Sequence, residues 1–423
     1  MRIPLQSPAL KVALPAACWL ILLVYVGAAG SEFLAAHFAE DASLPTLLRA
    51  VRLQPRNAEY HYRLGRYYSL LQPSPEEAIK SYRTAVALNP HQARYWFALA
   101  GTYQLLGNAA AQGTALERAI LAEPTTPDVA WEAANFYVVQ GEPEKALNEL
   151  KVVLANDPYL PATALPLCWR IRPDADFLLR ELVPPLPAVY TTFLEFLISR
   201  HETAAAGKVW ERLSALDQPV ERRFVFDYIR FLVAQREPEL AARVWQQAAR
   251  LADLSAYQPS AENILVNGDF SLEILNGGFD WLYHKSNDVS LMLDPTQFQS
   301  GHASLFLAFD SRGIEDAGVR QLIAVRPDTS YQFSAYFKAE DIEGAGGPRF
   351  VVQDLYSAKI FFASDYLTDV DFWKQINGSF TTDADTRLVV LRVQRDPANS
   401  PIKGRLWIDN LALRPLRPQE QGQ

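Results

Sequence analysis

Four prolines recur at nearly constant spacing in the N-terminal part of this 423-residue chain. They are Pro55, Pro90, Pro124 and Pro158. Because the residue before a proline avoids helical geometry, each of these prolines is expected to end a helix. The interval of about 34 residues lies within the range of about 20–50 that is typical of a repeat array. The chain is therefore expected to stack similar units into a solenoid in which each unit contacts its neighbours.

Two amphipathic stretches precede each proline, so each unit is expected to be a pair of helices. One place in each unit requires a small residue because the two helices approach closely there, and it is held by Gly65, Ala100 and Ala134. The pattern resembles the tetratricopeptide repeat over residues 56–158, with a half-unit at 33–55, so we assign 33–158 to such repeats. The resemblance implies a concave face that binds a peptide or helix of a protein partner. A purely structural spacer is the alternative.

The helical pattern continues beyond the fourth proline. The pair Val209-Trp210 returns as Val244-Trp245 after nearly the same interval. We interpret residues 159–256 as degenerate repeats that continue the solenoid. Several tyrosines of the first units are candidates for lining its groove, although packing between repeats explains them at least as well; they are Tyr60, Tyr62, Tyr67 and Tyr95.

The N-terminus carries a membrane-targeting pattern. Arg2 and Lys11 precede the uncharged apolar residues 12–29, and about 17–25 such residues span a bilayer. With positive charge before the run, the rest of the chain is expected outside the cytoplasm. We interpret residues 1–30 as a signal-anchor in the cytoplasmic (inner) membrane, with a periplasmic bulk. Secretion after signal cleavage is the alternative, because small residues follow the run at 27–29.

The C-terminal part has a different composition and a different period. Residues 1–263 hold 8 of the 20 glycines, and residues 264–423 hold the other 12. Apolar residues alternate there with polar ones, as a half-buried strand requires. We predict a β-sandwich or jelly roll over 264–415, with a linker at 257–263 and a disordered tail at 416–423. The expected strands include 304–309, 331–337, 349–352, 359–362, 387–393 and 405–408.

An ordered set of short phrases makes the C-terminal prediction more specific. It includes Leu265-Val-Asn-Gly-Asp-Phe270, then Gly278-Phe-Asp-Trp281, and finally Leu406-Trp-Ile-Asp-Asn-Leu411. Their order resembles a carbohydrate-binding module with a galactose-binding-like jelly roll. The resemblance implies that aromatic rings stack on a sugar, with burial in the core as the alternative for Trp281 and Trp373. The candidates by residue type are Trp281, Tyr283, Tyr356, Tyr366, Trp373 and Trp407.

The same resemblance implies a structural calcium ion near the first and last strands. Asp409 stands at the matching position of the last strand, and Asp269 lies in the first phrase. Carboxylate oxygens suit such a hard cation. The alternative is that each aspartate only stabilises a turn.

Charge and motif content limit the remaining classes of function. The net charge of −8 and the pI near 5.4 argue against nucleic acid as a partner. The six histidines form no metalloprotease motif, and no nucleotide-binding loop or nucleophile elbow is present, so we expect no catalytic residues. The sequence therefore predicts a multidomain α + β protein: a transmembrane helix, an α-solenoid and a C-terminal jelly roll.

Our hypothesis from the sequence is a non-enzymatic, membrane-anchored scaffold. Its solenoid would bind a protein partner and its jelly roll a glycan, as exopolysaccharide or cell-envelope assembly would require. Two alternatives stay open: a jelly roll that binds protein instead of sugar, and a glycan-active enzyme with an unrecognised site.

Overall fold

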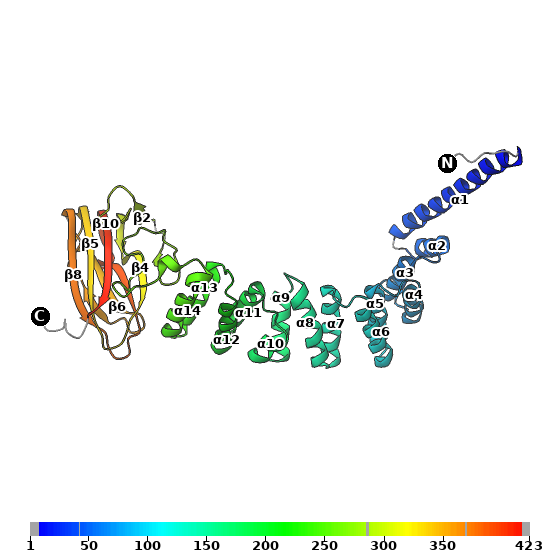
Figure 1. Ribbon diagram of the computed structural model, residues 1–423, viewed down its shortest axis with the longest axis horizontal. Helices are drawn as coiled ribbons and strands as arrows, with labels where there is room; N and C mark the ends of the chain where they lie inside the picture. The colour runs from blue at the N-terminus through cyan, green and yellow to red at the C-terminus, as the bar shows by residue number, and fades with distance from the viewer. Residues whose placement is uncertain (1–7, 42, 285–286, 369, 417–423) are drawn as a thin grey trace. The chain divides into compact units, whose positions relative to one another are not determined.

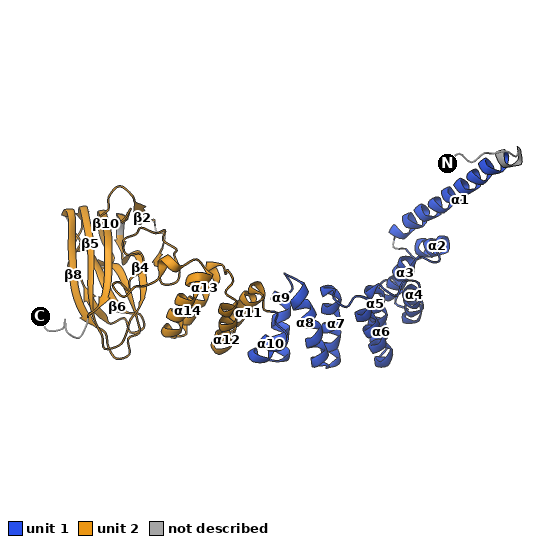
Figure 2. Ribbon diagram, viewed as in Figure 1, with its two compact units in different colours: residues 1–184 blue, residues 185–423 orange. Residues whose placement is uncertain are grey.

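A computed structural model describes residues 8–41, 43–284, 287–368 and 370–416 (Figure 1). These residues contain fourteen α-helices, then one short 3-10 helix and ten strands. By its internal contacts the chain divides into two compact units, Met1–Pro184 and Pro185–Gln423 (Figure 2). The predicted α + β class, with helices preceding strands, is confirmed. The predicted disordered tail lies outside the described residues, apart from residue 416.

The first unit is helical throughout its described part. Its helices are α1 Pro8–Glu40, α2 Leu44–Leu53, α3 Ala58–Leu70, α4 Pro75–Leu88, α5 Ala93–Leu105, α6 Ala109–Ala122, α7 Pro127–Gln140, α8 Pro143–Asn156, α9 Pro161–Ile171 and α10 Ala175–Glu181.

The four periodic prolines end helices as the sequence predicts. Each one directly follows the C-cap residue of α2, α4, α6 or α8. The close approach within a helix pair is also confirmed. A Cβ added to Gly65 of α3 would lie 2.5 Å from a ring carbon of Tyr82 in α4, and Ala100 and Ala134 are fully buried at the same place in their pairs.

Helix α1 joins the N-terminal apolar segment to the solenoid without a break. Over Val12–Glu40 it is long and apolar enough to cross a membrane, and the side chains from Val12 to Val26 are exposed. Its last turns bury Ala35 and Ala39 against Ala50 of α2 and Tyr60 of α3. The end of α1 therefore packs with α2 and α3 in the region where the sequence predicts a half-unit.

The second unit begins with two further helix pairs. They are α11 Pro187–Ser199 with α12 Thr203–Ala215, and α13 Arg222–Ala234 with α14 Pro238–Leu251. The two periodic tryptophans, Trp210 and Trp245, are each 2 % exposed. The 3-10 helix η1 Ser255–Tyr257 follows α14.

The strands of the second unit form two five-stranded antiparallel sheets. One has the order β1-β4-β9-β6-β7 and the other β2-β3-β10-β5-β8. The core lies between them, and the residues predicted to share one face, Tyr331, Phe333, Ala335 and Phe337, are at most 2 % exposed. The strands are β1 Trp281–Tyr283, β2 Val289–Asp294, β3 Ser304–Ile314, β4 Asp316–Ala324, β5 Ser330–Glu343, β6 Gly347–Asp354, β7 Ile360–Ala363, β8 Val370–Thr381, β9 Leu388–Asp396 and β10 Ser400–Pro415.

The last helix pair packs directly against the sandwich. Trp245 of α14 lies against the loop before β1, where its ring centroid is 6.0 Å from that of Phe279. A Cβ added to Gly278 would lie 2.1 Å from the Trp245 ring, and the φ of +61° at Gly278 also favours glycine. Only glycine therefore fits between this tryptophan and the loop.

Polar contacts reinforce this junction. The Tyr356 hydroxyl donates to the Val233 carbonyl (3.0 Å), and Arg387 pairs with Glu239 (3.0 Å). Trp245 donates to the carbonyl of Tyr257, inside the segment predicted as a linker (3.0 Å). Helices α11–α14, which the sequence predicts to be degenerate repeats, belong by packing to one unit with the sandwich.

Candidate functional site

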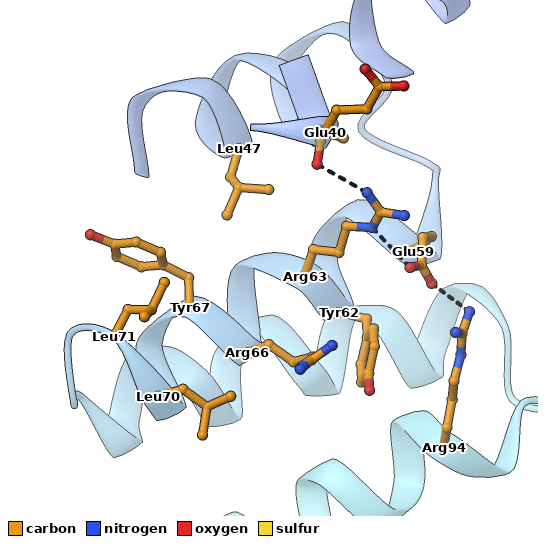
Figure 3. A pocket seen from close by; sticks show the side chains of 11 residues that line it. Glu40, Leu47, Glu59, Tyr62, Arg63, Arg66, Tyr67, Leu70, Leu71 and Arg94 are labelled. Carbon is orange, nitrogen blue, oxygen red and sulfur yellow. Dashed lines mark hydrogen bonds and ion pairs between the residues drawn. The ribbon is translucent and has the colours of Figure 1, made fainter. Parts of the chain in front are cut away.

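A groove of about 540 Å³ lies in the first unit, against the side of α3 (Figure 3). Helices α1, α2, α3 and α5 supply its lining, and we call it the α3 groove. Tyr62, Arg66 and Leu70 follow one another along one side of α3 (Figure 3). They recur every four residues, which places them on one helix face. Of the tyrosines predicted for such a groove, Tyr62 and Tyr67 line it, whereas Tyr60 and Tyr95 are buried between helices.

One carboxylate in the groove is shared by two arginines. Glu59 accepts from Arg63 (3.0 Å) and from Arg94 of the next helix pair (2.6 Å). Arg63 also donates to the Ala39 carbonyl at the end of α1 (2.9 Å). Arg66 is exposed and has no hydrogen-bond or ion-pair partner among the residues that the structure describes. The groove therefore presents one cation that no carboxylate of the described chain neutralises.

Apolar side chains stand beside this cation. Leu70 and Leu71 at the end of α3 are 66 % and 65 % exposed, and both line the groove with Tyr67 and Leu47. A surface that combines exposed leucines, tyrosine rings and an unpaired arginine can recognise a ligand with both an apolar part and a carboxylate.

The six aromatic candidates for sugar stacking lie in very different surroundings. Trp281 is 1 % exposed, packs on Phe270 and donates to the Asn267 carbonyl (3.0 Å). Trp407 is 5 % exposed, packs on Phe306 and donates to Asp294 (2.8 Å). Neither indole has a free face for a sugar ring, so for Trp281 the structure favours the core alternative that the sequence left open.

The four other candidates are at least partly accessible. Tyr356 is half-buried at the junction with α13, where Arg236 lies over its ring (5.4 Å). Tyr283 is half-buried at the end of β1. Tyr366 is 44 % exposed, and its hydroxyl donates to Asp396 (3.0 Å). Trp373 is half-buried on β8 beside Phe372, which is 66 % exposed. The six candidates are spread over β1, β8, β10 and two loops, and sequence reasoning missed the exposed Phe372.

The two calcium candidates lie at one seam of the sandwich. Asp409 is fully buried and accepts from the backbone N–H groups of Gln299 (2.7 Å), Ser300 (2.8 Å) and Asn410 (2.6 Å). Burial raises the pKa of Asp409, and the nearby Asp269 carboxylate raises it further. The Ser300 hydroxyl is buried and has no hydrogen-bond partner among the residues that the structure describes.

These residues offer a calcium ion two carboxylates and one free hydroxyl oxygen, and calcium takes six to eight oxygens. In the described residues no group of three histidine, cysteine or acidic side chains is close enough to hold a metal. Asp269, Asp409 and Ser300 are the residues that would hold the ion. Their oxygens are of the kind that calcium prefers, but they supply fewer ligands than calcium takes, so calcium binding here is a proposal.

One further carboxyl group has an unusual pKa. Burial raises the pKa of Asp280 to about 6, although the backbone N–H groups of Leu275 and Trp281 and the Asn267 side chain lower it. A pKa in this range suits a general acid. Asp280 directly precedes β1 and is 0 % exposed, so its carboxyl group is out of reach of a substrate in solution.

Comparison with known families decides the nature of the first helix pairs. Residues 58–92 and 93–126 match the tetratricopeptide repeat. These two helix pairs are tetratricopeptide repeats. The matches cover α3 to α6 and therefore include most of the α3 groove. None of the curated proteins matches the sequence.

Several solved structures are similar to parts of the chain. A protein described under "CBM4 structure and function" is 14 % identical and covers 36 % of this chain and 99 % of its own (TM-score 0.28). Pseudomonas aeruginosa pilF is 16 % identical, and the similarity covers 52 % of this chain and 93 % of the pilF chain (TM-score 0.27). The CBM22-1 xylan-binding domain of Paenibacillus barcinonensis Xyn10C is 18 % identical, and the similarity covers 37 % of this chain and 97 % of that domain (TM-score 0.27).

Proposed function

We propose that this protein is an exported, membrane-anchored scaffold whose tetratricopeptide repeats bind a segment of a protein partner in the α3 groove. The observation that carries the proposal is Arg66, which has no ion-pair or hydrogen-bond partner in the described part of the chain, beside the exposed Leu70 and Leu71. Exposed leucines that gather beside a groove indicate a surface that becomes buried in a complex. Tyrosine and arginine are the side chains that most often dominate binding energy in such interfaces.

A selection of displayed random peptides against the full chain in lipid nanodiscs tests this proposal. We expect enriched peptides whose binding is lost in Leu70→Asp, because a carboxylate there removes an apolar contact and adds repulsion for acidic ligands. The matched control is Leu121→Asp on α6, because Leu121 is 70 % exposed and does not line the groove. If no peptide is enriched, or if Leu70→Asp and Leu121→Asp behave alike, the proposal is wrong.

Membrane anchoring by α1 can be tested with the two cysteines of the chain. Cys18 is exposed within the apolar part of α1, and Cys168 is fully buried in α9, where burial raises the pKa of its thiol to about 12. In intact membranes we expect neither thiol to react with a maleimide-polymer tag, since the bilayer shields one and the core the other. After denaturation an uncleaved chain should carry two tags, whereas a single tag would show that the segment containing Cys18 had been removed.

Glycan binding by the sandwich is a second candidate function. It is favoured by the exposed aromatic side chains Phe372 and Tyr366 and by the half-buried Trp373, because aromatic rings on a surface can stack on sugars. We expect the full chain to bind on a glycan array and the double variant Phe372→Ala/Trp373→Ala to lose that binding. Phe298→Ala, which removes another exposed aromatic ring of the sandwich, is the control. Absence of any glycan signal, with and without calcium, would contradict glycan binding and favour the alternative that the sandwich binds protein.

A further inference from the structure

An exposed apolar residue occupies the thirteenth position of three successive first helices. Leu70 in α3, Leu105 in α5 and Val139 in α7 are 66 %, 79 % and 69 % exposed. Counted from Ala58, Ala93 and Pro127, where these helices begin, each residue is the thirteenth. Singly scattered exposed apolar residues are normal on a protein surface, whereas these three occupy the same position of successive helix pairs. We call these three residues the apolar ridge.

The ridge continues from the α3 groove along the repeats. Leu70 belongs to both the groove and the ridge. Helix α3 contacts α5, and α5 contacts α7, so the three ridge residues lie on neighbouring helices. Packed helices are about 8–10 Å apart from axis to axis. An α-helix rises by about 10.5 Å in seven residues. A partner helix laid across α3, α5 and α7 would therefore meet one ridge residue every seven residues.

The ridge favours a helical ligand over an extended one. Leu70, Leu105 and Val139 lie within α-helices, whose backbone groups bond to one another, so the ridge offers no free strand edge to pair with. A helix satisfies its own backbone hydrogen bonds and needs only side-chain contacts. Arg66 lies one turn before Leu70 on the same side of α3 (Figure 3). Since it has no partner in the described chain, it selects a carboxylate beside the first apolar contact.

We infer that the α3 groove and the apolar ridge bind an amphipathic helix of a protein partner. This helix carries apolar residues at seven-residue intervals and an acidic residue beside the one that meets Leu70. The inference rests on the proposed function and specifies the partner's chemistry.

A set of designed peptides and a charge exchange test the inference. The reference peptide spans three heptads, with leucine at every seventh position and one glutamate beside the first leucine; a second peptide replaces that glutamate by lysine. Affinity for the full chain in nanodiscs is measured by fluorescence anisotropy. We expect Arg66→Glu to lower the affinity for the glutamate peptide about 10–100-fold, the usual range for a charged hydrogen-bonded pair. The same substitution should raise the affinity for the lysine peptide. Leu105→Asp should also weaken binding, and Leu121→Asp should not.

A third peptide, with proline at its centre, separates a helical ligand from an extended one. If it binds as well as the reference peptide, the helical inference is wrong. If displayed peptides bind in a Leu70-dependent manner but their affinity is unchanged by Arg66→Glu, the inferred acidic residue of the partner is wrong, while the proposed function stands. If neither designed nor displayed peptides bind, both fail.

Discussion

Gly278→Ala is expected to destabilise the second unit by about 3 kcal/mol or more. The added Cβ would lie 2.1 Å from the Trp245 ring, well inside van der Waals contact, and a φ of +61° is unfavourable for alanine. Trp245 cannot move away easily because it is 2 % exposed and donates to the Tyr257 carbonyl. Overpacking typically costs about 1–3 kcal/mol, and backbone strain adds about 1 kcal/mol.

The effect can be measured by native-state hydrogen exchange in β3, β5 and β10, whose slowest amides report unfolding of the whole unit. The control is Gly207→Ala in α12 of the same unit, where the nearest atom to an added Cβ is 3.9 Å away. Alanine in a helix should stabilise that variant by about 0.5–1 kcal/mol. Equal stabilities of the two variants would show that α14 does not pack on the sandwich in this way.

Asp409→Ala is expected to lower the free energy of unfolding by about 3 kcal/mol or more. The substitution leaves the N–H groups of Gln299, Ser300 and Asn410 without their acceptor, and each buried donor left unpaired costs about 1–3 kcal/mol. Asp409→Asn keeps one acceptor oxygen and should lose less. The thermal unfolding midpoints of the three proteins check this order, and an alanine variant as stable as the wild type would contradict it.

The same midpoints test the calcium proposal. An ion that binds only the folded state raises the midpoint as its concentration rises. If Asp269 and Asp409 hold calcium, the ion should raise the midpoint of the wild type, and Asp269→Ala should abolish that rise. A wild-type midpoint that is the same in calcium and in chelator would leave Asp409 with its turn-stabilising role alone.

The helical repeats could be predicted because their signals are local. A proline acts on the residue before it, and a small residue is required where Gly65 meets Tyr82. The expected strands lie within β3, β5, β6, β7, β9 and β10, apart from single residues at their ends, but β1, β2, β4 and β8 were missed. In β4 the alternation is broken by Gln321, which is fully buried and pairs through its side-chain amide with the backbone of Val266. Edge strand β8 is polar because much of it faces solvent.

The candidate sites depended on information that residue type does not carry. Sequence identifies Trp281 and Trp407 as aromatic, but it does not show that they are buried. In the fold each indole N–H finds an acceptor in another segment, the Asn267 carbonyl for Trp281 and Asp294 for Trp407. The docking of α14 on the sandwich likewise depends on a contact between Trp245 and Gly278, which lie in different elements far apart along the chain. The apolar ridge did have a local signal: leucine or valine recurs at the thirteenth position of three first helices, a place that burial does not require.

The most direct test of binding along the repeats is photocrosslinking of the full chain to the reference peptide. A benzophenone side chain replaces Leu105 in one variant and Leu121 in another, because both leucines are exposed and only Leu105 lies on the ridge. The proposed binding mode predicts an adduct at position 105, competed by unlabelled peptide, and none at position 121. Adducts of equal yield at both positions, or at position 121 alone, would contradict it.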